Sequence, residues 1–315
     1  MKKPLIILTG PTAVGKTSLS IALAKAVNGE IISADSMQVY RHMDIGSAKI
    51  RPEEVHGVPH HLVDCLEPDE EFNVVRFQQM AKEAMEGIYA RGRIPVLVGG
   101  TGFYIQAVTG DIDFTVHGED TTYRRMLEEK AKTEGAQVLH EMLAAVDPAS
   151  AEAIHANNVK RVIRALEYYQ QTGKPISQHN EEQRQKESPY NLAYFVLNDD
   201  RSRLYERIDA RIDQMLDEGL IDEVKALKEM GYHKGMVSMQ GLGYKEILSY
   251  LDGTWSLEEA VYILKRDTRH FAKRQITWFK RERQVEWFDK QEFGYDSQAI
   301  LDAMLASLRE KKIIE

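Results

Sequence analysis

Gly10-Pro11-Thr12-Ala13-Val14-Gly15-Lys16-Thr17 is the stretch that decides the fold, because it fits the pattern G-x-x-x-x-G-K-[ST] without a mismatch. An apolar run over residues 3–9 predicts a buried strand before it, and the spacing over 16–27 predicts a helix after it. In such a loop the glycines let successive backbone N–H groups point at one anion, and the dipole of the helix favours the same charge. Lys16 can reach the terminal phosphates, and the Thr17 hydroxyl can ligate Mg²⁺. The sequence therefore predicts a phosphate site with Mg²⁺ as its cofactor.

Strands and helices alternate along the chain. Further strands are expected over 30–34 and 94–98, with a helix over 72–89 between them, and later strands over 192–197 and 285–288. Strands that alternate with helices favour a parallel sheet with helices on its faces. We therefore predict an α/β fold, a P-loop NTPase-like parallel sheet flanked by helices.

The middle of the chain has a different character. From about 113 to 188 the pattern is almost wholly helical, without a convincing strand. We therefore predict a helical insertion domain over 113–188, set into an α/β core formed by 1–112 and 189–315. One long helix is expected over 203–230.

The composition excludes several classes of protein. The chain has 315 residues, of which 43% are hydrophobic and 29% charged, as is typical of a soluble globular protein. Its longest apolar runs are too short to cross a bilayer, and its N-terminus lacks the features of a signal peptide. One cysteine excludes an internal disulfide framework and a multi-cysteine zinc site. We expect a cytoplasmic protein that does not bind membranes and acts as a monomer.

Positive charge is concentrated near the C-terminus. Residues 265–283 hold eight basic and two acidic side chains, a net charge of +6, in a chain whose net charge is -8. Aromatic residues lie between these cations, as in stretches that hold phosphates and stack unpaired bases. The same stretch continues a helix expected to begin at Ser256, with Glu259 completing a capping box. The other explanation is an amphipathic helix with a solvated basic face and its aromatic residues in the core, since charge runs are usually solvated faces.

A phosphate-binding loop is shared by kinases, GTPases, motor ATPases and some transferases. The base-reading sequence N-K-x-D of GTPases does not occur, and the strand over 94–98 ends in Gly99-Gly100 rather than in the acidic pair of a motor ATPase. Small-substrate enzymes of the nucleotide-kinase type remain. Asp35 follows the second strand and should lie beside the loop, because the carboxyl ends of parallel strands line the ligand crevice. It could act as a base, as a ligand in the metal and phosphate shell, or as a structural cap.

Several further motifs resemble the tRNA dimethylallyltransferase family, also called tRNA isopentenyltransferases. They occur in the family's order over nearly the whole chain: Asp35-Ser36 with Gln38-Val39-Tyr40, Met43 to Lys49, Val98 to Gly102, Lys160-Arg161, Arg164 to Glu167, Gly243-Tyr244 and Ala272 to Trp278. The chain ends without the cysteines of the zinc finger that eukaryotic members add, so it resembles the bacterial form.

The resemblance implies transfer of a dimethylallyl group from dimethylallyl diphosphate to N6 of adenosine 37, next to the anticodon, with release of diphosphate. The motif alone predicts ATP in this loop, whereas the resemblance implies that the loop binds the diphosphate of the prenyl donor. The residues of the loop are Gly10, Pro11, Thr12, Ala13, Val14, Gly15, Lys16 and Thr17. Asp35 matches the family's general base, Thr101 the threonine at the mouth of the site, and Arg211 the arginine that assists the diphosphate.

The same resemblance implies contacts with the tRNA anticodon stem-loop. The matching residues are Asp35, Ser36, Met37, Gln38, Thr101, Arg124, Lys160, Arg161, Val162, Ile163, Arg164, Gln240, Gly241, Leu242, Gly243, Tyr244 and Lys245. The chain departs from the family at Gln240 and Lys245, where the family often has arginine.

Two other functions fit part of the sequence. A small-molecule or nucleotide kinase would explain the loop and the α/β core, but it leaves Lys160–Arg164 and Lys273–Trp278 without a role. An RNA-binding module that uses the loop as an anion clamp would not explain Asp35 beside it.

Overall fold

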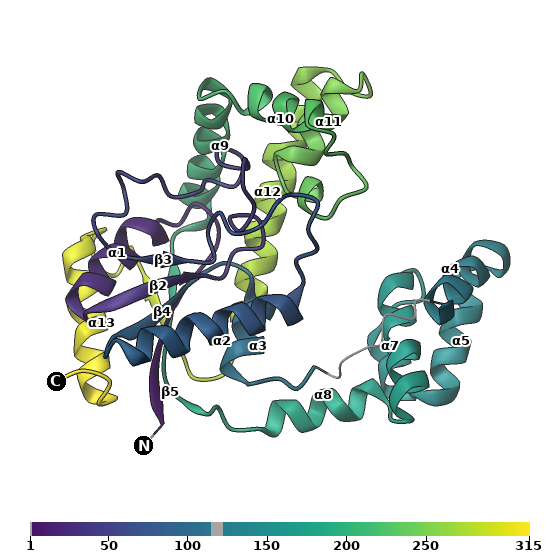
Figure 1. The fold of residues 1–315 in the computed structure, drawn as a ribbon, viewed down its shortest axis with the longest axis horizontal. Helices are drawn as coiled ribbons and strands as arrows, with labels where there is room; N and C mark the ends of the chain where they lie inside the picture. The colour runs from purple at the N-terminus through teal and green to yellow at the C-terminus, as the bar shows by residue number, and fades with distance from the viewer. Residues whose placement is uncertain (1, 115–121) are drawn as a thin grey trace. The chain divides into compact units, whose positions relative to one another are not determined.

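A parallel sheet of six strands forms the centre of the computed structural model, which describes residues 2–114 and 122–315 (Figure 1). The strands are β1 (Lys3–Thr9), β2 (Gly29–Ser33), β3 (His60–His61), β4 (Ile94–Gly99), β5 (Tyr190–Asn198) and β6 (Val285–Asp289). Their order in the sheet is β3-β2-β4-β1-β5-β6, and every pairing is parallel. The predicted α/β fold is therefore confirmed.

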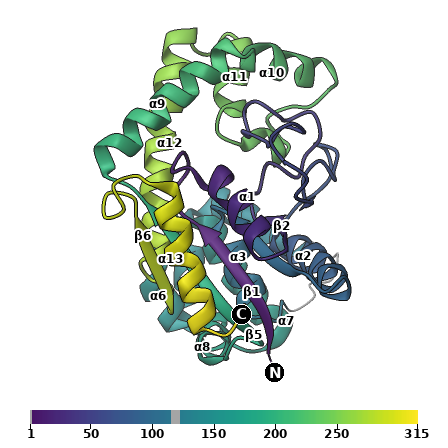
Figure 2. The same cartoon turned by 90° about the vertical axis from the view of Figure 1, so that its left-hand side faces the viewer.

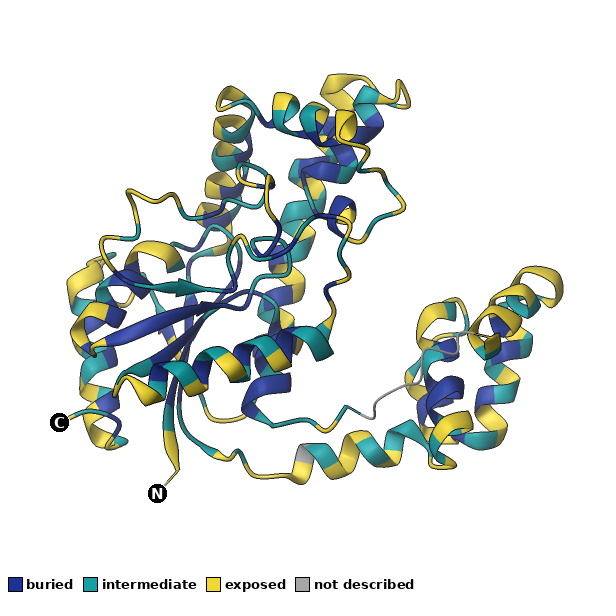
Figure 3. Cartoon of the chain, in the orientation of Figure 1, coloured by how far each residue is buried: buried dark blue, intermediate teal, exposed yellow. Residues whose placement is uncertain are grey.

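The central strand shows why this sheet is stable. Ile7 of β1 lies opposite Leu97 of β4 on one side and Tyr194 of β5 on the other. The side chains of residues 5–8 have no exposed surface, as expected for a parallel sheet covered on both faces. Figure 3 shows this burial continuing along the neighbouring strands.

Helices cover both faces of the sheet. The pair α1 (Lys16–Ala26) and α13 (Ser297–Glu310) lies on one face, and the pair α2 (Val74–Ala90) and α3 (Gly102–Thr109) lies on the other (Figures 1 and 2). The remaining core helices follow β5 in the chain: α9 (Arg201–Asp217), α10 (Leu220–Glu229), the 3₁₀ turn η1 (Ser238–Gln240), α11 (Tyr244–Leu251) and α12 (Leu257–Phe279).

Two expectations about these later helices have different outcomes. The capping box at the start of α12 is confirmed, since Ser256 Oγ accepts from the Glu259 N–H at 3.1 Å and the Glu259 carboxylate accepts from the Ser256 N–H at 2.8 Å. The single helix expected over 203–230 is wrong. The chain breaks between α9 and α10 at Gly219, whose φ of 102° lies in the region that favours glycine.

Residues Gly110–Glu187 form a second compact unit, whereas Met1–Thr109 and Ser188–Glu315 form the first. The second unit takes the place of the insertion expected over 113–188. Its helices are α4 (Thr122–Glu134), α5 (Ala136–Val146), α6 (Pro148–Ala153), α7 (Val159–Thr172) and α8 (Ile176–Gln185). They enclose a core of their own, which includes Leu127, Leu139, Leu143 and Val162. Throughout the described ranges, no helix combines the length and the apolar character that a membrane span needs.

Candidate active site

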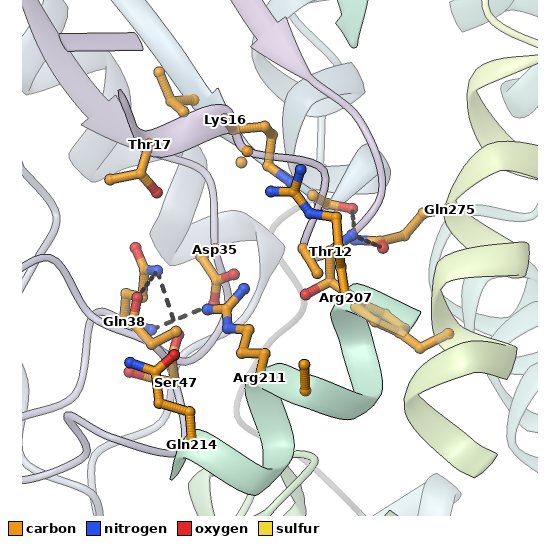
Figure 4. Close-up of a pocket in the computed structure, with 18 residues that line it drawn as sticks. Thr12, Lys16, Thr17, Asp35, Gln38, Ser47, Arg207, Arg211, Gln214 and Gln275 are labelled. Atoms are coloured by element: carbon orange, nitrogen blue, oxygen red, sulfur yellow. Dashed lines mark hydrogen bonds between the residues drawn. The ribbon is translucent and has the colours of Figure 1, made fainter. Parts of the chain in front are cut away.

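A cavity of about 480 Å³ lies in the first unit, where the loop after β1 meets the loops after β2 and β4. Residues of helices α9 and α12 line its other sides, and Figure 4 shows the side chains that line it. Among them are Thr12, Lys16, Thr17, Asp35, Gln38, Ser47, Arg207, Arg211, Gln214 and Gln275. The site thus occupies the carboxyl ends of parallel strands, where α/β sheets bind their ligands.

The loop after β1 needs glycine at its first position. Gly10 has a φ of 144°, and a Cβ there would lie 2.2 Å from the Leu197 carbonyl oxygen of β5. The loop is therefore pressed against the sheet in a conformation that no side chain allows. Lys16 folds over this loop and donates from Nζ to the carbonyl oxygens of Gly10 and Pro11, at 2.9 and 2.8 Å.

Positive charge gathers around Lys16. Burial and the charge of Arg211 lower the pKa of Lys16 to about 8, while Asp35 acts in the opposite direction. Burial also lowers the pKa of Arg211, although Asp35 opposes this shift as well. Arg207 and Lys290 approach the loop near Gly15. Several cations held close together without a matching number of carboxylates form a site that favours an anion.

Asp35 faces these cations from the loop after β2. Its Oδ1 accepts from the backbone N–H of Met37 at 2.8 Å and of Gln38 at 3.4 Å, which fixes the carboxylate in a turn. Within the part of the chain that the structure describes, Oδ2 accepts no hydrogen bond. Asp35 therefore combines a fixed orientation with one oxygen that is open to the cavity.

Gln275 connects two of the loops that form the cavity. Its buried side chain accepts from the Thr12 N–H at 2.8 Å and donates to the Gly100 carbonyl oxygen at 3.0 Å. One amide group of α12 thus fixes the distance between the phosphate-binding loop and the loop after β4. Gln275 lies in the family motif from Ala272 to Trp278, but the motif alone gave it no role.

Arg207 is a second residue that the sequence analysis missed. It lies four residues before Arg211 on α9, so both side chains project from the same face of the helix toward the cavity. This helical spacing is a signal that could have identified it. Lys290 follows β6 and gave no comparable signal in the sequence.

Thr101 lies at the start of α3 rather than in the wall of the cavity. Its N–H donates to the Ala34 carbonyl oxygen at 3.3 Å, and its carbonyl oxygen accepts from the Tyr104 N–H. The preceding residue, Gly100, does line the cavity. A place for Thr101 at the mouth of the site stays a prediction.

Two of the segments expected to contact tRNA come together in the first unit. Gly241 approaches Met37 so closely that a Cβ at position 241 would lie 2.7 Å from the methionine sulfur. The Tyr244 side chain is fully buried, and its hydroxyl accepts from the Ser47 N–H at 3.1 Å. The side chains of Gln240 and Lys245 are more accessible. Contact of this assembly with RNA stays a prediction.

The other expected tRNA-contacting residues lie in the second unit. Arg124 pairs with the Glu167 carboxylate through two hydrogen bonds of 2.9 and 2.7 Å. Lys160 and Arg161 are exposed at the start of α7, whereas residues 162–163 point into the core of the unit. The exposed side chains of Lys160 and Arg161 are therefore accessible to RNA, whereas the Arg124 guanidinium is engaged by Glu167. Burial lowers the pKa of Arg164, the remaining cation of this segment.

Two family models match the sequence. A model described as "IPP transferase" matches residues 38–282, and one described as "Isopentenyl transferase" matches residues 3–64. A tRNA dimethylallyltransferase of Lachnoclostridium phytofermentans is 66% identical over 99% of this chain and 100% of its own length. The protein of the same name from Carboxydothermus hydrogenoformans is 53% identical over 92% of this chain and 93% of its own.

Solved structures agree with these matches. The tRNA isopentenylpyrophosphate transferase of Bacillus halodurans is 47% identical, with a TM-score of 0.74 over 99% of this chain and 98% of that one. A eukaryotic dimethylallyltransferase, described as acting on tRNA, is 32% identical, with a TM-score of 0.79 over 91% of this chain and 74% of that one. The resemblance seen in the motifs is confirmed, and the chain belongs to the tRNA dimethylallyltransferase family, whose members are also named isopentenyl transferases.

Proposed function

We propose that this enzyme transfers the dimethylallyl group of dimethylallyl diphosphate to N6 of adenosine 37 in tRNA and releases diphosphate. The observation that carries this proposal is the cavity, in which a phosphate-binding loop, Lys16 and Arg211 face the carboxylate of Asp35. The cationic side suits an anionic leaving group, and the carboxylate suits a proton acceptor. The alternative of a small-molecule or nucleotide kinase finds no support among the relatives above.

The cationic side and the Asp35 carboxylate have separate tasks in the reaction. The bond from the allylic carbon to the diphosphate oxygen breaks, and a bond from N6 to that carbon forms. Negative charge grows on the diphosphate, where the loop N–H groups, Lys16 and Arg211 stabilise it. N6 loses one proton, which Asp35 accepts on Oδ2 while Oδ1 stays bound in its turn. A placed base matters here, because an exocyclic adenine amine is a poor nucleophile.

Mg²⁺ fits this cavity together with the diphosphate, whose negative charge offsets that of the surrounding cations. The ion keeps several waters and binds through few protein ligands together with substrate phosphates. The residues described by the structure contain no cluster of three or more His, Cys, Asp or Glu that could hold a metal ion by itself, while Thr17 supplies a hydroxyl in the cavity wall. Thr17 would hold Mg²⁺ jointly with the diphosphate, and the bound ion would add charge stabilisation to the leaving group.

The adenine must leave the stacked anticodon loop before N6 can reach the donor. Residues 35–38 and 240–245, which pack together beside the cavity, would meet the extruded nucleotide and its neighbours. The exposed Lys160 and Arg161 of the second unit would contact phosphates of the anticodon stem. Because its substrate is a tRNA, we place the enzyme in the cytoplasm, and we expect it to act as a monomer.

Labelled substrates test this function directly. The protein is incubated with labelled dimethylallyl diphosphate and unmodified tRNA, and in parallel with labelled ATP and candidate acceptors. We expect label in the tRNA, and no label in a tRNA that carries guanosine at position 37. Phosphate transfer without prenyl transfer would establish the kinase alternative instead.

A further inference from the structure

One carboxylate outside the cavity organises the loop of residues 44–47. Glu223, in the first turn of α10, accepts from the backbone N–H of Asp44 at 3.0 Å and of Ile45 at 2.7 Å on Oε2. Its Oε1 accepts from the Gly46 N–H at 3.1 Å and from the Tyr244 hydroxyl at 2.8 Å. Three consecutive backbone donors thus converge on a single side chain that lies far away in the sequence.

Tyr244 completes this arrangement from α11. Its hydroxyl donates to Glu223 and accepts from the Ser47 N–H, so four successive N–H groups of the loop are bound by two side chains. Its ring fills the space beside Gly46, where an added Cβ would lie 2.6 Å from Cζ. Burial and the adjacent Glu223 carboxylate raise the pKa of Tyr244 well above its usual value, which keeps the hydroxyl protonated as a donor.

The loop held in this way continues into the wall of the cavity. Ser47 and Ala48 line the cavity, and their carbonyl oxygens accept from Gln38 Nε2 at 3.4 and 3.3 Å. The Gln38 N–H in turn donates to Asp35 Oδ1 at 3.4 Å. A continuous series of contacts therefore runs from Glu223 to the carboxylate that we propose as the base.

These contacts all lie on the Asp35 side of the cavity. Figure 4 shows Gln38 and Ser47 together on the side of Asp35, away from Thr12 and Gln275. The phosphate-binding loop has separate supports, in β1 and in the hydrogen bonds of Gln275. A change at Glu223 should therefore reach the proton acceptor and leave the diphosphate side in place.

We propose that Glu223, acting with Tyr244, is a positioning residue that holds the 44–48 loop and Gln38 so that Asp35 is correctly placed for proton transfer. Glu223 does not line the cavity and takes no part in the chemistry itself. This inference rests on the proposed prenyl transfer with Asp35 as its base.

Substitution Glu223→Gln tests this role, because it keeps the size of the side chain while it removes the charge and turns an NH₂ group toward backbone donors. We expect kcat for tRNA prenylation to fall by about 10²-fold, the effect of misplacing a catalytic group by about 1 Å. The dissociation constant of dimethylallyl diphosphate should stay within about twofold of the wild-type value, since the loop that holds the diphosphate is unaffected. The matched control is Glu229→Gln, an exposed position on the same helix, which should leave both quantities unchanged.

Tyr244→Phe provides a milder second variant, because it removes one buried hydroxyl and keeps the ring beside Gly46. The hydroxyl donates to Glu223 and accepts from the Ser47 N–H, so two hydrogen bonds are lost and we expect kcat to fall by about tenfold. The effect should shrink when Glu223→Gln is already present. Donor titration gives the fraction of active sites in each variant, to which kcat is normalised. An unchanged normalised kcat in Glu223→Gln, or an equal loss of donor affinity and kcat, would overturn the positioning role. Failure of the wild-type protein to label tRNA would instead refute the proposed function.

Discussion

Asp35 offers the cavity one carboxylate oxygen that is fixed by backbone bonds and one that is open. Substitution Asp35→Asn retains an Oδ1 acceptor for the turn but removes the basic group, whereas Asp35→Ala removes both. If Asp35 is the base, both variants should lower kcat by roughly 10²–10⁴ and leave donor and tRNA affinities largely intact. Single-turnover kinetics and equilibrium binding separate these quantities.

The same pair of variants distinguishes the other roles of this residue. A structural cap would let Asp35→Asn keep near wild-type kcat, because the turn survives. A ligand in the metal or phosphate shell would make both variants lose donor affinity while the rate of chemistry persists.

If the loop after β1 holds the donor diphosphate, donor binding should depend on pH through Lys16. Its pKa of about 8 reflects burial and the nearby positive charge of Arg211, and a bound diphosphate would favour the charged amine. Below pH 8 the amine is charged both before and after binding, so affinity should be flat. Above pH 8 the free enzyme must take up a proton to bind, so the dissociation constant should rise up to about tenfold per pH unit. Titration of the donor between pH 7 and 9.5 measures this, and Lys16→Met should abolish the rise.

Local sequence patterns predicted the helices and strands whose structure depends on residues close together in the sequence. The strand before the glycine-rich loop and the helix after it were predicted correctly, because glycine spacing and apolar runs specify them directly. The two-residue strand β3 was missed, since a strand so short has no periodicity. The roles of Gln275 and Glu223 could not be predicted either, because their backbone partners lie 175 residues or more away and only the folded chain brings them together.

Glu30, a buried carboxylate at the start of β2, forms a cluster of ion pairs with more exposed side chains and takes no part in the cavity. Glu30 accepts from Arg91 at 2.9 and 2.7 Å, from Arg93 at 3.1 Å, and lies 2.7 Å from His61 Nε2. Hydrogen bonds from Arg91, opposed by burial, lower the pKa of Glu30 to about 2. The charged form is therefore preferred in the folded state, and its contribution is complete above the unfolded pKa near 4.5 and lost as the pH falls toward 2.

We expect Glu30→Gln to lower the free energy of unfolding by about 2 kcal/mol at pH 7, allowing for the solvent exposure of the arginines. The difference between wild type and variant should shrink between pH 4.5 and 2, as measured by denaturant unfolding across that range. A difference that is constant with pH would mean that packing, rather than charge, accounts for the loss.

At the scale of the whole molecule, positive charge is distributed unevenly over a chain of net charge -8. Part of the basic stretch 265–283 is neutralised inside the fold, since Arg269 pairs with Asp209 of α9 at 2.6 Å and Lys265 pairs with Asp213 at 2.5 Å. Lys273 and Arg274 stay exposed on α12. The part with Lys265 and Arg269 thus fits an amphipathic helix held by ion pairs. The part with Lys273 and Arg274 presents cations that phosphates could reach.

Salt dependence can show which exposed cations meet the tRNA. If Lys160, Arg161 and the exposed part of 265–283 contact the anticodon arm, the logarithm of the tRNA binding constant should fall with the logarithm of salt concentration. The slope should be about -0.7 for each phosphate neutralised in single-stranded or looped RNA. Reversing Lys160 and Arg161 to Glu should flatten this slope and weaken tRNA binding, while donor affinity should not change.

The matched control for this double reversal is Lys25→Glu with Lys312→Glu, two exposed cations of the first unit that produce the same change in net charge. If only total charge mattered, both double variants would weaken tRNA binding equally. A local contact predicts that the control keeps the wild-type slope, because exposed charges more than about 10 Å apart are largely screened at 0.1 M salt. A steep slope that survives the reversal of Lys160 and Arg161 would place the RNA on a different surface, and the exposed Lys273 and Arg274 of α12 would be the next pair to reverse.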